Sequence, residues 1–167
     1  MTSSDIIVVT GACGSGKTSI GRSIAAATGW DYVEGDSFLT PAERVEFEAG
    51  RLSEMDYERW LRAVGHWCDG YEKTGRSAVV ACSALTRQHR DLLREGRPDV
   101  RFCHLTADRQ TLRTRAGEPG ARHLRADLRA LEPLGHDEHG ATVSTVGVDD
   151  DVARWALAAL GLDPGHS

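Results

Sequence analysis

Residues 11–18 read Gly11-Ala12-Cys13-Gly14-Ser15-Gly16-Lys17-Thr18, which is a complete match to the pattern G-x-x-x-x-G-K-[ST]. The glycines let backbone N–H groups turn inward and form a nest that binds anions. Lys17 then reaches the β- and γ-phosphates of a nucleoside triphosphate, and the hydroxyl of Thr18 is a ligand for Mg²⁺. The motif therefore predicts a binding loop for ATP and Mg²⁺ that extends from Gly11 to Ser19.

The segments around this motif support the prediction. Ile6-Ile7-Val8-Val9 is a continuous apolar run, as expected for a strand that is covered on both faces, and residues 17–28 have helical periodicity. Farther along, strand-like and helical patterns alternate, which is typical of a parallel sheet. We expect strands at about 6–9, 30–33, 77–81, 100–105 and 142–146. We expect helices at about 17–28, 41–49, 54–73, 87–95, 108–115, 124–131 and 149–160, with a mobile loop at 117–123.

The composition is that of one ordinary globular domain. The chain has 167 residues, of which 40% are hydrophobic and 27% are charged, so a core can form without disulfides or metal ions. Together with the order of elements, this predicts a single three-layer α/β domain over residues 1–167. Its five-stranded parallel sheet should carry the phosphate-binding loop at the carboxyl end of the first strand.

Charge, cysteines and hydropathy limit the partners of the chain. A net charge of -5 does not favour binding to a nucleic acid backbone, which requires a basic face, although it does not exclude a local basic pocket. The four cysteines, Cys13, Cys68, Cys82 and Cys103, form no C-x-x-C pair and are interpreted as reduced thiols. No signal peptide is visible, and no apolar stretch approaches the ~20 residues of a membrane span. We therefore expect a cytoplasmic protein that binds a small molecule and neither nucleic acid nor a membrane.

Other classes of protein with this loop can be excluded. A regulatory GTPase needs an Asn-Lys-x-Asp sequence to recognise guanine, and neither Lys17 nor Lys73 follows an asparagine. A motor or a helicase needs a far longer chain. What remains is a kinase of minimal size that acts on a small molecule or a nucleotide.

Three further stretches narrow this class. They are Glu34-Gly35-Asp36, the run from Cys82-Ser83-Ala84-Leu85 to Arg90-Asp91-Leu92-Leu93-Arg94-Glu95-Gly96, and Leu131-Glu132-Pro133 with Asp137-Glu138. With the loop they cover most of residues 5–150, and through them the chain resembles the gluconate kinases (gluconokinases). These are relatives of the shikimate kinases within the nucleoside-monophosphate-kinase-like P-loop NTPase fold. The resemblance implies a phosphotransferase that moves the γ-phosphoryl group of ATP to a hydroxyl of gluconate or a similar polyhydroxy acid.

The resemblance also implies roles for residues that follow the second and third strands. Asp36 would act in catalysis with Lys17, because it would orient the acceptor hydroxyl and accept its proton. Glu34 would hold a water molecule on Mg²⁺. Ser83 and Arg90 would bind the acceptor, and Arg90 would hold a carboxylate or phosphate in bidentate fashion.

The resemblance also implies a lid segment, at about 115–125, that contains functional arginine side chains. Arg115 matches the arginine at the start of the lid that packs against adenine, so it is expected both to bind the nucleotide and to act in catalysis. Arg113, Arg122 and Arg125 lie nearby, and one or two of them would close over the phosphates. Members of the family often pair, so a homodimer is one expectation for this chain.

The acceptor side of the chain departs from the family pattern. Thr40 stands where the family has a histidine before a proline, Arg44, Phe47 and Glu48 replace the Asn and Lys-Met of the next helix, and the lid is several residues shorter. Two alternatives therefore remain open. One is a kinase of the same fold that acts on another alcohol, such as a specialised metabolite, an antibiotic or a nucleoside. The other is an ATP-binding module without an acceptor.

Overall fold

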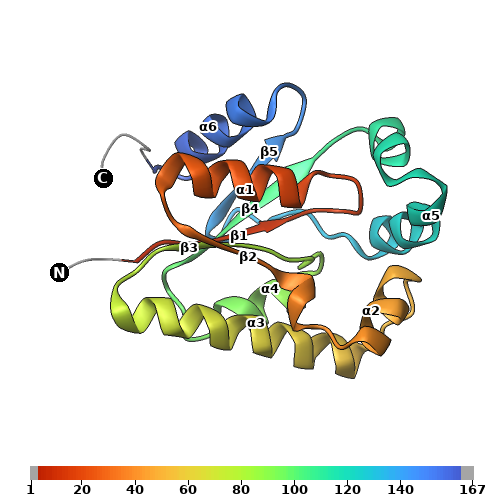
Figure 1. Cartoon of the computed structure of the whole chain (residues 1–167), viewed down its shortest axis with the longest axis horizontal. Helices are drawn as coiled ribbons and strands as arrows, with labels where there is room; N and C mark the ends of the chain where they lie inside the picture. Colours follow the sequence, from red (N-terminus) through yellow and green to blue (C-terminus); the bar gives the residue numbers. More distant parts are fainter. Residues whose placement is uncertain (1–3, 163–167) are drawn as a thin grey trace.

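The computed structural model describes residues 4–162, which form a parallel sheet with helices on both faces (Figure 1). The sheet order is β2-β3-β1-β4-β5, and every neighbouring pair of strands is parallel. The strands are β1 (Ile6–Thr10), β2 (Asp31–Glu34), β3 (Ala78–Ala81), β4 (Val100–Thr106) and β5 (Gly140–Ser144). The helices are α1 (Lys17–Thr28), the 3-10 helix η1 (Gly35–Phe38), α2 (Pro41–Glu48), α3 (Glu54–Thr74), α4 (Arg87–Arg94), α5 (Arg109–Ala130) and α6 (Asp149–Ala159). The predicted fold class is confirmed.

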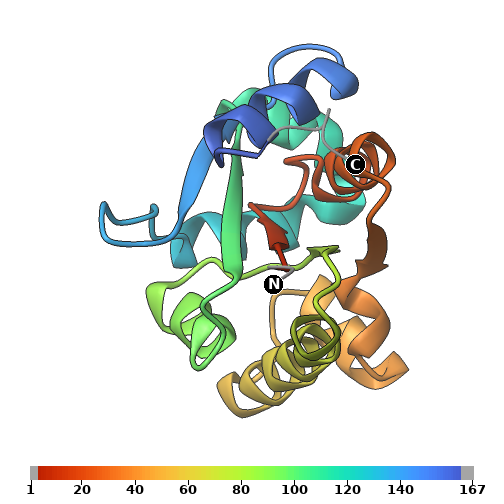
Figure 2. The ribbon, with the colours of Figure 1, turned by 90° about the vertical axis from the view of Figure 1, so that its left-hand side faces the viewer.

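The central strand β1 shows why helices cover both faces of the sheet. Its side chains alternate between two apolar clusters, and all four apolar residues are fully buried. Ile6 and Val8 belong to the cluster that includes α3 and α4, whereas Ile7 and Val9 belong to the cluster that includes α1 and α6. Figure 2 shows these two helix layers on opposite sides of the strands. Burial on both faces explains why this strand is apolar throughout instead of alternating with polar residues.

The carboxyl ends of the strands lie along one edge of the sheet, and α2 and α5 lie beyond it, at the right of Figure 1. The rings of Phe47 in α2 and His123 in α5 are in contact, with centroids 4.5 Å apart. Trp60 of α3 fixes the turn after β2, because its Nε1 donates to the carbonyl of Gly35 at 2.8 Å. The turn after β2 is therefore held by α3, and α2 is held against α5, each by a specific contact.

Side-chain caps determine where the helices near this edge begin. Thr40 and Glu43 form a reciprocal capping box at the start of α2. Ser53 caps α3 and Asp108 caps α5, each by accepting a hydrogen bond from the backbone N–H three residues later. These caps are local in sequence, which is why the starts of the helices could be predicted to within a residue or two.

The helix α5 differs from its prediction. The sequence predicts a loop at 117–123, but α5 runs from Arg109 to Ala130 with a kink at Gly117, where φ is 66° and ψ is -176°. Pro119 is tolerated because it falls in the first turn of the second half, where its missing N–H has no helical acceptor. The sequence signals a break here, and the structure resumes the helix at once. In addition, β5 runs from Gly140 to Ser144, two residues earlier than the predicted strand at 142–146.

The two longest helices, α3 and α5, have 21 and 22 residues and are long enough to be considered as membrane spans. Both carry charged residues along their length. Among residues 4–162 no helix combines the length and the apolar character needed to cross a bilayer.

Candidate active site

The loop between β1 and α1 has the backbone conformation that its glycines predict. Gly14 and Gly16 have φ angles of 86° and 93°, in the left-handed region that other residues rarely adopt. A Cβ atom added to Gly14 would lie 2.6 Å from the carbonyl oxygen of Leu112 in α5. Glycine is therefore needed here both for the turn and for the close approach of α5. The loop leads directly into the N-terminus of α1, which favours a bound phosphate.

Lys17 is the first residue of α1, and its side chain folds back over the loop. The ammonium Nζ donates to the carbonyl oxygens of Gly11 at 2.8 Å and Ala12 at 3.3 Å. Both acceptors are neutral, so the positive charge of Lys17 has no ionic partner among these contacts. Phosphate oxygens that entered the loop would be stronger acceptors for the same N–H groups.

Thr18 and Glu34 place hydroxyl and carboxylate oxygens side by side. The Thr18 hydroxyl donates to the Glu34 carboxylate, with distances of 2.9 and 3.0 Å to its two oxygens, and the Tyr32 hydroxyl donates to Glu34 Oε2 at 2.5 Å. Burial, together with this hydrogen bond, raises the pKa of the Tyr32 phenol, so it remains a donor at neutral pH. Hydroxyl and carboxylate oxygens are ligands that Mg²⁺ accepts, usually with water and phosphate oxygens. The donor set therefore fits a magnesium ion.

A cavity of about 440 Å³ lies beside the loop, and Lys17, Thr18, Glu34, Asp36 and Ser83 are among the residues that line it. Burial raises the pKa of the Asp36 carboxyl and the nearby charge of Glu34 raises it further, while the positive charge of Lys17 lowers it. A carboxylate with a raised pKa is a better proton acceptor than an ordinary one. One cavity thus holds a cation for phosphate, oxygen ligands for a metal ion and a basic carboxylate, the groups that phosphoryl transfer to a hydroxyl requires.

Comparison with known proteins gives the family of the chain. No protein-family model matches it. Gluconokinase from Gluconobacter oxydans (strain 621H) is 34% identical to it over 145 residues, which are 83% of this chain and 81% of that protein. The chain belongs to the gluconokinase family. The resemblance to gluconate kinases is confirmed, and with it the enzyme class, a phosphotransferase with an alcohol group as acceptor.

Two solved structures agree with the gluconokinase assignment. A sugar kinase from Janibacter sp. HTCC2649 superposes on the chain with a TM-score of 0.87 and 34% identity, and the match covers 96% of both chains. A gluconokinase from Sinorhizobium meliloti 1021 gives a TM-score of 0.82 with 32% identity, covering 94% of this chain and 91% of that one. The likeness therefore extends over nearly the whole fold and is not limited to the phosphate loop.

Arg90 does not have the role that the gluconokinase resemblance suggested. Its side chain is 0% exposed, and Nε and Nη2 donate to the two oxygens of Glu138 at 2.8 and 3.1 Å. Nη1 donates to the carbonyls of Ala84 and Leu85, and Nη2 donates also to the carbonyl of Pro133. All five N–H groups of the guanidinium are satisfied inside the protein. The prediction that Arg90 binds the acceptor is wrong, because this arginine instead joins α4 to residues 133–138.

Ser83 and Arg115 lie in positions that allow their predicted roles. Ser83 follows β3 and is buried, and its carbonyl accepts a hydrogen bond from the hydroxyl of Tyr57 at 2.9 Å. Arg115, in the first half of α5, donates to the hydroxyl and carbonyl of Thr145 at 3.0 and 3.4 Å. A Cβ atom added to Gly16 would lie 3.9 Å from Nη1 of Arg115, so this arginine is beside the phosphate loop.

Two residues of α5 reach the site although sequence reasoning missed them. Asp127 is 6% exposed, and its Oδ2 accepts a hydrogen bond from the backbone N–H of Cys13 at 2.8 Å. His123 lines the cavity that holds Asp36, and its Nε2 lies 3.4 Å from Oδ1 of Asp127. The two are four residues apart and share one face of the helix. The spacing of four residues between His123 and Asp127 was the signal that could have identified them, but it was not recognised because a loop was predicted at 117–123.

Proposed function

We propose that this member of the gluconokinase family transfers the γ-phosphoryl group of ATP to a hydroxyl of gluconate or a similar polyhydroxy acid. The observation that carries the proposal is the cavity lined by both Lys17, in the phosphate loop, and Asp36, after β2. A group that binds phosphate and a group that accepts a proton therefore border the same space. Relatives that are named gluconokinases, at 32% and 34% identity, support the choice of acceptor.

For the nucleotide half of the site, we propose ATP with Mg²⁺. The loop amides would bind the phosphates, and Lys17 would neutralise charge on the β- and γ-phosphates. Thr18 would bind Mg²⁺ directly and Glu34 would bind it through a water molecule. Arg115, held by Thr145 beside the loop, would pack against adenine. When bound, Mg²⁺ neutralises charge that develops on the phosphate oxygens during transfer.

For the acceptor half, we propose that Asp36 is the base. The acceptor oxygen forms a bond to the γ-phosphorus, and the bond from that phosphorus to the β–γ bridging oxygen breaks, so that ADP leaves with the electron pair. The proton of the acceptor hydroxyl passes to the Asp36 carboxylate. The raised pKa of Asp36 supports this role because it brings the group closer to neutral pH. Ser83 lines the same cavity and would bind a second hydroxyl of the acceptor.

The acceptor carboxylate needs a cation other than Arg90, since that residue is paired with Glu138. Arg44 of α2 is exposed, and its Nη2 donates to the backbone carbonyl of Asp36 at 3.0 Å. Its guanidinium therefore lies beside the proposed base. We propose that Arg44 binds the carboxylate of the sugar acid, which places acceptor selection in the segment where the chain departs from the family pattern.

A coupled assay of ADP release tests the proposal. The panel contains sugar acids, polyols, nucleosides and aminoglycosides, with Lys17→Ala as the inactive control. We expect gluconate or another sugar acid to give the highest kcat/KM, and Arg44→Ala to raise its KM by about 10-fold or more while the KM for ATP changes little. If a nucleoside or an aminoglycoside leads the panel, the kinase reaction stands but the acceptor is wrong. If no compound exceeds the background ATPase, the kinase reaction itself is rejected.

A further inference from the structure

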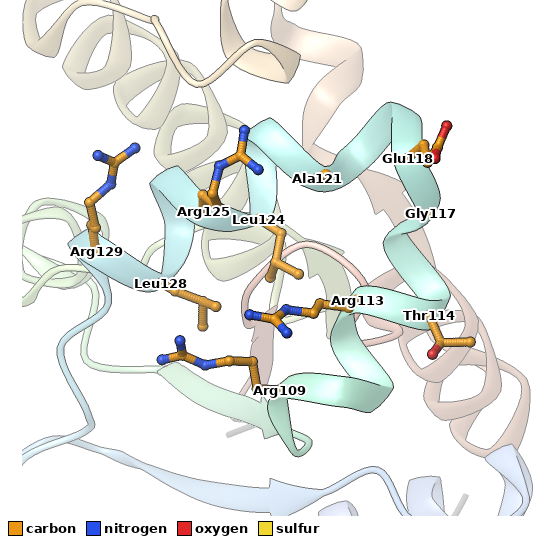
Figure 3. Close-up of a pocket in the computed structure, with 10 residues that line it drawn as sticks. All are labelled: Arg109, Arg113, Thr114, Gly117, Glu118, Ala121, Leu124, Arg125, Leu128 and Arg129. Carbon is orange, nitrogen blue, oxygen red and sulfur yellow. The ribbon is translucent and has the colours of Figure 1, made fainter.

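A second cavity, of about 840 Å³, lies between the two halves of α5 (Figure 3). It is larger than the cavity of about 440 Å³ that holds Lys17 and Asp36, and the two have no lining residue in common. The second half of α5 separates them, because Gly120 and His123 line one cavity while Leu124 and Arg125 line the other. Arg113 and Arg125, two of the lid arginines expected to close over the phosphates, line this second cavity and not the one that holds Lys17. The proposed kinase reaction does not otherwise use this space.

Four arginines line this cavity, whereas the chain as a whole has a net charge of -5. They are Arg109 and Arg113 from the first half of α5 and Arg125 and Arg129 from the second. Glu118 is the one acidic residue of the lining, and in Figure 3 its carboxylate points away from the arginines. All four are exposed, and in Figure 3 the guanidinium groups of Arg109 and Arg113 lie beside the leucines whereas those of Arg125 and Arg129 point away from them. The positive charge on the inner side of the cavity therefore comes from Arg109 and Arg113.

Within the described residues these four arginines have no protein partner, as is also the case for the exposed Arg62 and Arg122. Within residues 4–162, no acidic side chain lies within ion-pair distance of any of them, and none donates a hydrogen bond to a protein group. By contrast, Arg87, Arg90, Arg94 and Arg97 each pair with an acid, and the first three of them lie within ion-pair distance of the buried carboxylate of Glu138. Arg109 and Arg113 lie near each other in Figure 3 without a counter-charge, so they repel each other, and an anion in the cavity removes that repulsion.

The floor of the cavity is apolar. Leu124 is 2% exposed, and Figure 3 shows the guanidinium groups of Arg109 and Arg113 directed toward Leu124 and Leu128. A carbon skeleton or ring can pack on the leucines while the guanidinium groups bind its charged substituents in bidentate fashion. A volume of about 840 Å³ also falls in the range of small-molecule sites, which is ~300–1,000 Å³.

We propose that this cavity is a binding site for a small organic polyanion that carries several phosphate or carboxylate groups. The site is separate from the nucleotide and acceptor sites and does not depend on which alcohol the enzyme phosphorylates. It is nevertheless in contact with the phosphate loop, because Leu124 packs in one cluster with Ala12 of the loop and with Leu112. A ligand in the cavity would hold the two halves of α5 together and so fix the helix that supports the loop.

Isothermal titration with inorganic tripolyphosphate, in buffer without Mg²⁺, tests the proposal. The Lys17→Ala variant is used as the starting protein, so that binding at the phosphate loop is weakened. We expect this variant to bind tripolyphosphate at one site, and the further double change Arg109→Ala/Arg113→Ala to weaken binding by about 10-fold or more. A second titration, with wild-type protein saturated with ADP and Mg²⁺, should show the same site still free.

The matched control is Arg62→Ala/Arg154→Ala, which removes the same charge from two exposed arginines outside both cavities. We expect it to change the affinity by less than about 2-fold, and thermal unfolding verifies that all variants are folded. The proposal is overturned if both double variants weaken binding equally, if Lys17→Ala binds no tripolyphosphate, or if ADP with Mg²⁺ blocks the site. It is also overturned if a glutamate decamer binds with the expected arginine dependence and tripolyphosphate does not, since the occupant is then an acidic protein segment.

Discussion

The carboxylate of Asp127, in the second half of α5, accepts a hydrogen bond from the backbone N–H of Cys13 in the phosphate loop, with an N···Oδ2 distance of 2.8 Å. Backbone amides are the groups by which such a loop binds phosphate. The protein thus supplies an anionic group of its own to one amide of an anion-binding loop. Burial raises the pKa of Asp127, while the nearby His123 and Lys17 and the hydrogen bond from Cys13 lower it. The contact attaches α5 to the loop and places a carboxylate next to the proposed phosphate site.

Two substitutions at Asp127 separate the hydrogen bond from the charge. In Asp127→Asn the side-chain oxygen still accepts from Cys13, so we expect the Tm to stay within about 2 °C of wild type. Asp127→Ala leaves a buried N–H without a partner, which costs about 1–3 kcal/mol and lowers the Tm by roughly 3–10 °C in a domain of this size. Thermal unfolding followed by circular dichroism measures both. Equal losses in the two variants would mean that the charge, and not the hydrogen bond, holds α5 on the loop.

Replacement of Glu34 tests the proposed metal site. Glu34→Gln retains an acceptor for the hydroxyl of Thr18 but removes the negative charge that would hold a water molecule on Mg²⁺. We expect the Mg²⁺ concentration for half-maximal activity to rise by about 10-fold or more, the usual effect of losing an outer ligand. Activity measured against Mg²⁺ at saturating ATP gives this value. Tyr32→Phe is the matched control, because it removes only the hydrogen bond to Glu34 Oε2 and should shift the requirement less. Identical Mg²⁺ curves for wild type and Glu34→Gln would exclude the role.

The parts of the fold that the sequence predicts are those with a local physical cause. The run from Ile6 to Val9 is apolar because both faces of β1 are covered, and Gly14 is fixed by its own positive φ and by the approach of α5. Asp36 was predicted from the resemblance to the gluconate kinases. Its position after β2 agrees with that prediction, because the carboxyl ends of parallel strands lie at one edge of the sheet.

What the sequence does not predict depends on contacts between distant residues. Nothing local distinguishes Arg90 from an exposed helix arginine, because its burial is set by Glu138, which is 48 residues away in the chain. The stretch around Gly117 and Pro119 has the composition of a loop. Whether the helix resumes is decided by Leu124, which packs against Ala12 near the other end of the chain. Without that helix, the placement of Asp127 and of the arginine-lined cavity could not be predicted.

Asp36→Asn should remove activity without loss of stability. Burial raises the pKa of Asp36 above its ordinary value of 3.8, so the folded state favours the protonated form. For such a group the stabilising contribution is present below the unfolded pKa and is lost as the pH rises through the folded pKa. At neutral pH the ionised Asp36 therefore destabilises the fold, and the uncharged Asn should leave the Tm equal to or above that of wild type. We expect kcat to fall by about 10²–10⁴-fold. A Tm several degrees lower would contradict this reasoning.

The same shift in Asp36 predicts how activity depends on pH. The proposed base must be ionised, so kcat/KM should decrease as the pH falls through the pKa of Asp36, at a pH above the ordinary value of 3.8. A pH–rate profile at saturating ATP measures this acid limb, the decrease of kcat/KM as the pH falls, for wild type. The residual activity of Asp36→Asn should not show the same decrease. A profile whose acid limb is unchanged in the variant would assign the titration to another group.

The ion pair between Arg90 and Glu138 makes the stability depend on acid pH. Both side chains are 0% exposed. Burial by itself raises the pKa of Glu138, but hydrogen bonds from Arg90, the Gly135 amide and Arg94 outweigh burial and hold the pKa at about 2, below its ordinary value of 4.5. For a carboxyl with a lowered pKa, the stabilising contribution is fully present above the ordinary value and is lost as the pH falls toward the folded one. The contribution of Glu138 to stability should therefore disappear as the pH falls from 4.5 to about 2.

Glu138→Gln tests this contribution, because it leaves the buried guanidinium of Arg90 without a counter-charge. We expect a loss of about 3–5 kcal/mol in the free energy of unfolding at neutral pH, measured with urea. The difference from wild type should become smaller at about pH 3, since wild type then begins to lose the same charge. Asp137→Asn is the matched control one residue away. Its carboxylate pairs with Arg87 at the surface, with a side chain 70% exposed, so its removal should change stability little at either pH. A difference between wild type and Glu138→Gln that is the same at both pH values would show that hydrogen-bond geometry, and not the charge of Glu138, stabilises this part of the core.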